Sequence, residues 1–499
     1  MKKITPFLLL ISCLIILLVS SCSKDDHFQS SEKELFSFSF PDSLNPYLSK
    51  TITGKIEDSK IRLALPGLTN QKDLIASFDF KGKELLINGV PQKSGGTEND
   101  FSENLIYQLK AEDGSIKEYA IQIELIPEIP HLYIQTENDE KITSKDNYIT
   151  ADLKIDGKEI HKDFEGRTGI RGRGNSSWAL PKKPYKLKLD SKEGLFGLVP
   201  AKKWILLAEY LDGSMLYNAV PFKMGEMLGI PYTNHIIPVE VTLNGEYQGF
   251  YAFTEHKEVK EGRIDIGEEG WLLELDSYFD EPLKFKSDKY QLPVMLQYPK
   301  ADDMSPEEGL AVLHEVKKDF EKLENLIFDD SFPRNGYLDL FDHFAFVNYM
   351  LVYQLTKNSE ISHPKSTYIN KKKDGKYNMG IIWDFDWGFG YSNTQHYRLS
   401  TANSALLYGD APGTQFFNRI MEDPYIRAVF KVRWDWFRIN HFEELKAYVK
   451  AYAEQVSQAY KKDHDIWGKR DSTGDLEKDL DRLLTWLDAR AEYLDNLFR

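Results

Sequence analysis

The chain has 499 residues, with 63 Lys or Arg against 78 Asp or Glu, so its net charge is −15. The length predicts two or three domains of roughly 150 residues each. The acidic balance argues against a general nucleic-acid binder, because contact with phosphates requires a basic surface. The two cysteines, Cys13 and Cys22, both lie in the first 22 residues. Because the rest of the chain has no cysteine, a disulfide scaffold, a Cys-based zinc site and cysteine catalysis are excluded there.

The N-terminus has the pattern of a secretion signal. Lys2 and Lys3 precede an apolar run over 7–19, which is too short for a comfortable membrane span. The run ends in Leu-Val-Ser-Ser-Cys, which resembles a bacterial lipobox with Cys22 as the lipid attachment site. Residues 23–26 resemble the signal that sends Bacteroidetes lipoproteins to the outer leaflet of the outer membrane. We expect an outer-membrane lipoprotein that binds the membrane through an N-terminal lipid anchor. Surface exposure is favoured, and a periplasm-facing position is the alternative.

Residues 1–22 are thus predicted to be the signal peptide and lipobox, and the polar residues 23–33 a tether. Residues 34–126 are rich in short alternating segments, such as Phe36-Ser37-Phe38-Ser39-Phe40, with turn signals such as Asn88-Gly89 between them. This spacing favours a small all-β, immunoglobulin-like sandwich. No catalytic cluster occurs in it, so we interpret it as a spacer or interaction module.

Residues 127–440 combine strands with helices. The segments 185–189 and 203–208 are predicted strands, and 239–243 and 247–253 a hairpin around Asn244-Gly245. Helices are predicted over 214–228 and 338–355, and more helices over 441–499. Strands followed by helices indicate the α+β class.

The first chemical cluster is rich in glycine and arginine. Arg171-Gly172-Arg173-Gly174-Asn175-Ser176-Ser177-Trp178 precedes a strand with Lys183, Lys186 and Lys188. Glycines allow close approach of the backbone, and Arg and Lys bind phosphate. The pattern therefore fits a triphosphate cradle, although the P-loop spacing is absent. Taken alone, it also fits a tight turn with solvated charges.

The second cluster places two carboxylates after an apolar run, Ile381-Ile382-Trp383-Asp384-Phe385-Asp386. In a strand, Asp384 and Asp386 would point to the same side. Such a pair is unfavourable without a cation or proton between the carboxylates, and Mg²⁺ or Mn²⁺ would suit the oxygen ligands. The alternative is a structural turn, but the surrounding aromatic residues favour a site.

The third cluster is Asn358-Ser359-Glu360, directly after the long apolar helix. Asn358 could supply a metal ligand and Glu360 a general base. The alternative is an Asn helix cap followed by a solvated Glu.

Together, these blocks resemble the CotH kinase family over about residues 130–440. The carriers are 171–178, 182–189, 204–208, 243–249, 272–276 and 383–390, in the order of the family. The resemblance implies a divergent protein-kinase-like fold with a helical C-terminal part. It also implies transfer of the γ-phosphoryl group of ATP to Ser or Thr of a protein substrate or envelope partner.

The same resemblance implies roles for individual residues. Arg171, Arg173 and Asn175, with the three lysines of the first cluster, would face the phosphates. Glu255, at the end of the hairpin, would lie at the hinge beside adenine. Either Asp384 or Asp386, together with Asn358, would hold the metal.

One position departs from the family pattern. Members usually carry Asn-x-Asp after the long helix, and that Asp is taken as catalytic, whereas this chain has Glu360. A displacement of about one bond length can cost on the order of 10²-fold in rate. Glu274 or Asp276 could compensate. The first alternative function is therefore a catalytically weak or inactive scaffold that binds a protein or glycan at the cell surface.

Two further classes of enzyme fit the sequence less well. A haloacid-dehalogenase-like phosphatase uses an Asp-x-Asp motif after a strand, as in Asp384-Phe385-Asp386. However, that motif belongs near the start of a Rossmann-like domain, with Thr or Val where this chain has Gly388. A zinc hydrolase is disfavoured because the 11 histidines show no His-Glu-x-x-His spacing.

Overall fold

A computed structural model describes residues 29–392, 395–468 and 471–497. The predicted signal peptide and Cys22 lie outside these residues. Within the described part of the chain, no helix is both long enough and apolar enough to cross a membrane. The chain forms two compact units, one built mainly from residues up to 123 and one mainly from 124 onwards.

The N-terminal unit is all β. Its main sheets have the strand orders β2-β1-β6 and β3-β4-β11-β10-β7-β8, and β5 pairs with β9. The strands are β1 (Glu34–Phe40), β2 (Ile52–Thr53), β3 (Lys55–Glu57), β4 (Lys60–Pro66), β5 (Leu74–Ile75), β6 (Ser77–Lys81), β7 (Glu84–Ile87), β8 (Val90–Pro91), β9 (Glu98–Asn99), β10 (Ile106–Lys110) and β11 (Ile116–Ile126). The rings of Phe38, Phe78 and Tyr107 pack together in its core. The predicted β character is confirmed, and the immunoglobulin-like class stays a prediction.

The larger unit begins with a closed barrel of order β12-β13-β14-β15-β16-β18-β17. Its strands are β12 (His131–Thr136), β13 (Ile149–Asp156), β14 (Phe164–Gly172), β15 (Tyr185–Glu193), β16 (Ala201–Leu207), β17 (Ile237–Leu243) and β18 (Glu246–Glu255). Alternate residues such as Ile170, Leu187 and Trp204 point inward and form one core. The intervening residues face outward, which places the lysines of β15 on the outer face of the barrel.

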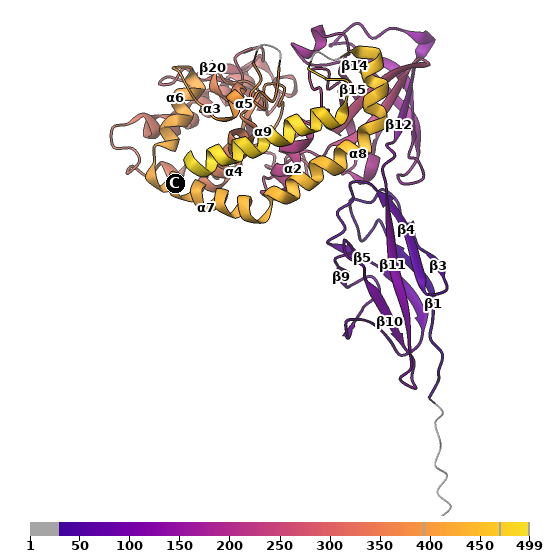
Figure 1. Ribbon diagram of the computed structural model, residues 1–499. Helices are drawn as coiled ribbons and strands as arrows, with labels where there is room; N and C mark the ends of the chain where they lie inside the picture. The colour runs from indigo at the N-terminus through magenta and orange to yellow at the C-terminus, as the bar shows by residue number, and fades with distance from the viewer. Residues whose placement is uncertain (1–28, 393–394, 469–470, 498–499) are drawn as a thin grey trace, which may run out of the picture. The chain divides into compact units, whose positions relative to one another are not determined.

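A second, five-stranded sheet follows, with order β20-β21-β19-β22-β23. Its strands are β19 (Trp271–Leu275), β20 (Lys284–Lys286), β21 (Pro293–Tyr298), β22 (Thr367–Lys371) and β23 (Tyr377–Met379). The helices are α2 (Ala219–Met227), α3 (Pro306–Phe328), α4 (His343–Thr356), α5 (Leu399–Ala402), α6 (Pro412–Met421), α7 (Pro424–Asn440), α8 (Phe442–Trp467) and α9 (Leu476–Leu497). The long helices α8 and α9 lie side by side (Figure 1), and α8 also contacts β18.

The predicted α+β class is confirmed, and so is the hairpin. Strands β17 and β18 pair through a two-residue turn. Asn244 and Gly245 both have positive φ, as a type I′ hairpin turn requires. The predicted helix over 214–228 begins later, at Ala219, because the Asp212 carboxylate accepts hydrogen bonds from the N–H groups of the preceding turn. The predicted helix over 338–355 begins at His343, where Asp342 caps it.

One local prediction was wrong. Residues 381–386 form no strand. The reason is the backbone of Asp384, whose φ of 60° interrupts an extended run. The two aspartates are therefore brought together by a loop and not by strand alternation.

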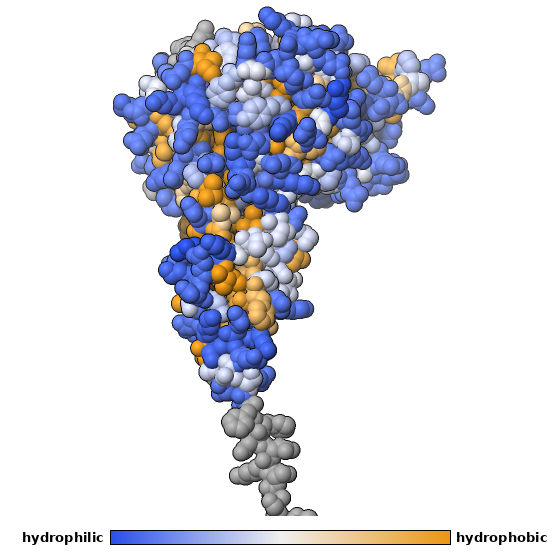
Figure 2. Space-filling model, turned by 90° about the vertical axis from the view of Figure 1, so that its right-hand side faces the viewer, coloured by the Kyte–Doolittle hydropathy of each residue, from blue (hydrophilic) through white to orange (hydrophobic). Residues whose placement is uncertain are grey.

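The surface of the larger unit is mainly hydrophilic on the face that Figure 2 shows. Hydrophobic residues are interspersed among the hydrophilic ones on this face of the unit. Its apolar side chains gather instead in two buried cores, one inside the barrel and one shared by the helices and the second sheet.

Candidate active site

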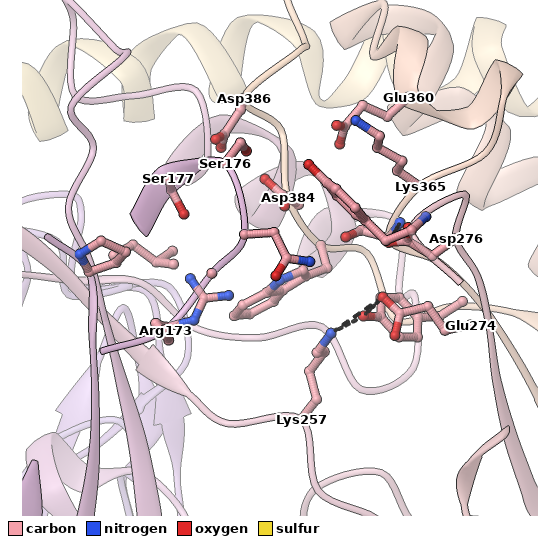
Figure 3. A pocket seen from close by; sticks show the side chains of 18 of the residues that line it. Arg173, Ser176, Ser177, Lys257, Glu274, Asp276, Glu360, Lys365, Asp384 and Asp386 are labelled. Atoms are coloured by element: carbon pink, nitrogen blue, oxygen red, sulfur yellow. Dashed lines mark hydrogen bonds and ion pairs between the residues drawn. The ribbon is translucent and has the colours of Figure 1, made fainter. Parts of the chain in front are cut away.

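The larger unit contains a polar cavity of about 350 Å³. Its wall combines segments that are far apart in the sequence: the loop 173–177 after β14, the segment 207–211 after β16, the end of β19, Glu360 and the loop 383–386. Five of the predicted binding and catalytic residues line this one cavity: Arg173, Asn175, Glu360, Asp384 and Asp386. Glu274 and Asp276, the two carboxylates that could compensate for Glu360, line it as well. Figure 3 shows most of these side chains around a single hollow.

The glycines of the first cluster are required by its geometry. A Cβ at Gly172 would lie 2.4 Å from the ring of Trp178. Gly174 has φ +83°, and a Cβ there would lie 2.2 Å from Ser177 Oγ. The loop is therefore folded tightly against its own side chains, which holds Arg173 and Asn175 at the cavity.

Hydrogen bonds fix the loop that carries the two aspartates. Asn358 Nδ2 donates to the Asp384 carbonyl at 2.9 Å, and the Phe385 N–H donates to Asn218 Oδ1 at 3.1 Å. Burial, followed by the negative charge of Asp384 and a hydrogen bond with it, raises the pKa of Asp386 well above its usual range. The two carboxyl groups are thus close enough to share a proton or a cation.

Glu360 lies on the short helix Ser359–Ser362 and is only 6% exposed. Its N–H donates to Asn358 Oδ1 at 3.2 Å, so the same Asn358 positions both Glu360 and Asp384. Burial, and then the charge of Asp384, raises the pKa of Glu360 well above its usual range. Its Oε2 is buried without a hydrogen-bond partner among the described residues, so this oxygen is available to a ligand.

Two cations face the carboxylates. The guanidinium of Arg173 is near both aspartates, whose charges favour its ionised form, while burial lowers its pKa. Its Cζ lies 5.6 Å from the centroid of the Trp383 ring. Lys257 follows β18, and burial lowers its pKa as well. Arg173 and Lys257 appear together below Asp384 in Figure 3.

Lys257 is held by a buried group of partners. Its Nζ contacts the Tyr368 hydroxyl and lies 3.9 Å from Glu274 Oε1. Tyr368 in turn donates to Glu274, and Gln297 Nε2 donates to the other Glu274 oxygen at 2.7 Å. Burial raises the pKa of Glu274 to about 7, against the opposing effect of Lys257.

Two more of the expected residues lie in an adjoining cavity of about 430 Å³. Arg171 and Lys186 line it, and it shares Arg173, Asn175 and Lys257 with the first cavity. Arg171 and Lys186 are register partners on β14 and β15, which explains why they project together from the outer face of the barrel.

The remaining expected residues lie outside both cavities. Lys183 Nζ donates to the Trp178 carbonyl at 2.8 Å, and Lys188 is exposed farther along β15. Glu255 is buried and accepts from the His235 N–H at 2.9 Å, with its Oε1 2.6 Å from His235 Nδ1. Asn358 lies behind Asp384, where both ends of its side-chain amide are bonded to the backbone.

Sequence reasoning missed Lys257 and Lys365. Lys365 lines the cavity, its charge opposes the rise in the pKa of Glu360, and its N–H donates to the Glu360 carbonyl at 2.9 Å. Neither lysine belongs to a dense motif. The only sequence signal is position, since Lys257 follows the hairpin directly and Lys365 precedes the strand β22.

The carboxylates of the cavity are also candidate ligands for a metal ion. No three His, Cys, Asp or Glu side chains of the described residues converge closely enough to hold a metal by themselves. Mg²⁺, however, commonly binds one or two carboxylates and completes its coordination with substrate phosphates and water. Asp384 and Asp386, which are close enough to share a cation, fit that kind of site.

Three comparisons relate the chain to known proteins. The chain is 15% identical to a "putative glycoside hydrolase" from Bacteroides thetaiotaomicron, with a TM-score of 0.16 over 57% of this chain and 88% of that one. No curated protein matches the chain. The family profile described as "CotH kinase protein" matches residues 170–494, which is more than half of the chain and spans every residue that lines the cavity. The chain therefore belongs to the CotH kinase family.

Proposed function

We propose that this protein transfers the γ-phosphoryl group of ATP to a Ser or Thr hydroxyl of a protein, with Mg²⁺ or Mn²⁺. The single observation that carries the proposal is the arrangement of one cavity, in which Arg173 and Lys257 face Asp384, Asp386 and Glu360. Phosphoryl transfer requires little covalent chemistry from a protein and depends on positioning and charge neutralisation. Both kinds of charge are present in this cavity.

The cations would bind the phosphates. Arg173 offers a planar fork of N–H donors and Lys257 a compact charge, which are the two usual ways of holding phosphate oxygens. The apolar side chains of Leu180, Leu207 and Leu211 also line the cavity and would cover the base. Asp384 and Asp386 would hold the metal, which when bound neutralises charge on the phosphates.

Glu360 would accept the proton of the acceptor hydroxyl. In the transfer, the hydroxyl oxygen forms a bond to the γ-phosphorus, the bond from that phosphorus to the β,γ-bridging oxygen breaks, and ADP leaves. The hydroxyl proton passes to the Glu360 carboxylate. Because the pKa of Glu360 is raised, the ionised base becomes more abundant as the pH rises.

The proposal includes a location. A lipid on Cys22 would tether the protein to the outer membrane, most simply at the cell surface, where its substrate would be another envelope protein. Labelling of the chain with a radioactive fatty acid tests this part. Loss of the label in Cys22→Ala is the expected result, and unchanged labelling would contradict it.

Calorimetric titration tests nucleotide binding directly. ATP with Mn²⁺ is expected to bind the wild-type protein and to bind Asp384→Asn or Asp386→Asn at least about tenfold more weakly. Asp330→Asn is a matched control, because Asp330 is exposed on the same unit. Absence of binding with either metal would overturn the proposal.

A further inference from the structure

The outer face of the barrel carries a stripe of cations beside the proposed active site. We define this basic stripe as Lys145, Arg171, Lys186 and Lys188. Arg171 pairs in register with Lys186, and Lys188 follows two residues later on the same face of β15. Lys145, Arg171 and Lys186 line the second cavity, which shares Arg173 and Lys257 with the first.

The stripe lacks carboxylate partners. Within the described ranges, none of its four cations lies within ion-pair distance of an Asp or Glu. Asp146, Asp280 and Glu281 line the same cavity but form no such pair with the stripe. This is unusual for a chain with a net charge of −15, in which opposite charges are abundant.

The contacts within the stripe are of the kind that an anion would complete. Lys186 Nζ lies 2.7 Å from His256 Nε2, and no acceptor is near the buried Nδ1 of the same ring or Nε of Arg171 among the described residues. Arg171 Cζ and Lys188 Nζ both lie over the ring of Tyr148, at 5.0 and 5.7 Å from its centroid.

Burial and neighbouring positive charge both disfavour the ionised form of Lys186. Burial, and then the charges of Arg171 and Lys203, lowers the pKa of Lys186 to about 7. Lys203 itself is paired with Glu258 at 2.9 Å and is therefore not part of the stripe. A negative group placed between Arg171 and Lys186 would relieve this repulsion and would be bound strongly for that reason.

We infer that the basic stripe binds an acidic segment of the acceptor protein while its hydroxyl group reaches Glu360. This inference rests on the proposed function and adds the class of acceptor: a Ser or Thr flanked by Asp or Glu. An extended segment suits the stripe better than a second nucleotide, because the cations follow the strands β14 and β15 out of the cavity to the exposed Lys188. Complementary charge of this kind sets specificity and the rate of encounter.

Fluorescence anisotropy with labelled peptides tests the inference without relying on catalysis. One peptide carries a Ser flanked on both sides by Glu, and its partner has Gln at those positions. At low salt, the purified protein with ADP and Mn²⁺ is expected to bind the Glu peptide at least about tenfold more tightly, and to lose this preference at high salt. Equal affinity for the two peptides would overturn the inference.

Three double variants separate the effect of the basic stripe from the effect of net charge. Lys186→Gln with Lys188→Gln is expected to reduce the preference to about threefold or less. Lys286→Gln with Lys318→Gln removes the same charge from exposed positions elsewhere on the unit and is expected to retain it. Lys186→Arg with Lys188→Arg keeps the charge and is expected to retain the preference, which shows that positive charge at these positions is what the peptide requires. Retained ATP binding shows that the Gln variant is folded.

The outcomes also separate this inference from the proposed function. If ATP binds but the Gln double variant binds ATP about tenfold more weakly with an unchanged peptide preference, the stripe belongs to the nucleotide and the inference is wrong. If ATP does not bind at all, the proposed function fails, whatever the peptide result. Binding of phosphatidylglycerol vesicles without binding of the Glu peptide would assign the stripe to a membrane and would also overturn the inference.

Discussion

The side chain of Asn358 links the two acidic parts of the site: its Nδ2 donates to the Asp384 carbonyl at 2.9 Å, and its Oδ1 accepts from the Glu360 N–H at 3.2 Å. Asn358 is completely buried. The proposed base and the proposed metal ligand are therefore held by one amide. Their separation is set by the interior of the protein and not by solvent-exposed loops.

Replacing this amide should affect transfer more than folding. Asn358→Ala removes both hydrogen bonds and is expected to cost about 1–3 kcal/mol in the free energy of unfolding. Because it releases the backbone at both Asp384 and Glu360, transfer is expected to fall on the order of 10²-fold. Single-turnover phosphorylation and urea unfolding measure the two effects. Asn378→Ala, which removes only a local bond to the Lys376 carbonyl, should leave the rate within about twofold. An unchanged rate in Asn358→Ala would contradict this account.

The length of the side chain at position 360 should determine the rate. Glu360→Gln keeps the shape but cannot accept a proton, so transfer is expected to fall by about 10²-fold or more while ATP affinity changes little. Glu360→Asp provides the carboxylate that is usual in the family and is expected to raise transfer above that of the wild type. Rates measured at saturating ATP across the pH range test both variants. A rate for Glu360→Gln equal to that of the wild type would exclude Glu360 as the base.

A buried ion pair should support the barrel. Lys182 Nζ and Asp463 Oδ1 are in contact, and both side chains are 0% exposed. Asp463 Oδ1 also accepts from the Phe250 N–H at 2.9 Å, which attaches α8 to β18. Removing one partner leaves a buried charge, so Lys182→Met or Asp463→Leu is expected to cost about 3–5 kcal/mol.

The double variant completes the test of this pair. Lys182→Met with Asp463→Leu is expected to recover much of the loss, because two apolar side chains replace two buried charges. Chemical unfolding of the four proteins gives the interaction energy of the pair. Strictly additive losses would show that the two charges act independently.

Burial of Glu274 should make stability depend on pH. Its pKa of about 7 in the folded protein lies above the ordinary value of 4.5. Between these pH values the folded state retains a proton that the unfolded chain releases, so stability falls as the pH rises from about 4.5 to about 7. The loss is complete above that range. Glu274→Gln keeps a hydrogen-bond acceptor but does not titrate, and is expected to lose less stability over this interval, by on the order of 1–3 kcal/mol.

Urea unfolding at several pH values measures this difference. The raised pKa values of Glu360 and Asp386 act in the same direction and remain in the variant, so some dependence on pH is expected in both proteins. Parallel stability curves for the wild type and Glu274→Gln would contradict the shift at Glu274.

The sequence by itself determined the elements whose formation depends on neighbouring residues. The hairpin around Asn244-Gly245 follows from two residues that tolerate positive φ, and the helix α4 from a continuous apolar run. The blocks that resemble the CotH kinase family were also visible in the sequence, because the family match depends on residue types and their order. The pairing of Asp384 with Asp386 was predicted for the wrong reason, since a loop and not a strand brings them together.

Only the tertiary structure decided which charges share the cavity. Arg173, Lys257 and Glu360 come from segments separated by about 80 to 100 residues, and their approach depends on the packing of the barrel against the second sheet and α4. Glu255 and Lys188 have the same side-chain chemistry as residues in the site. In the fold, however, Glu255 is buried and paired with His235, and Lys188 is exposed. Residue type is a local property, whereas burial and the nearest opposite charge are set by the whole fold.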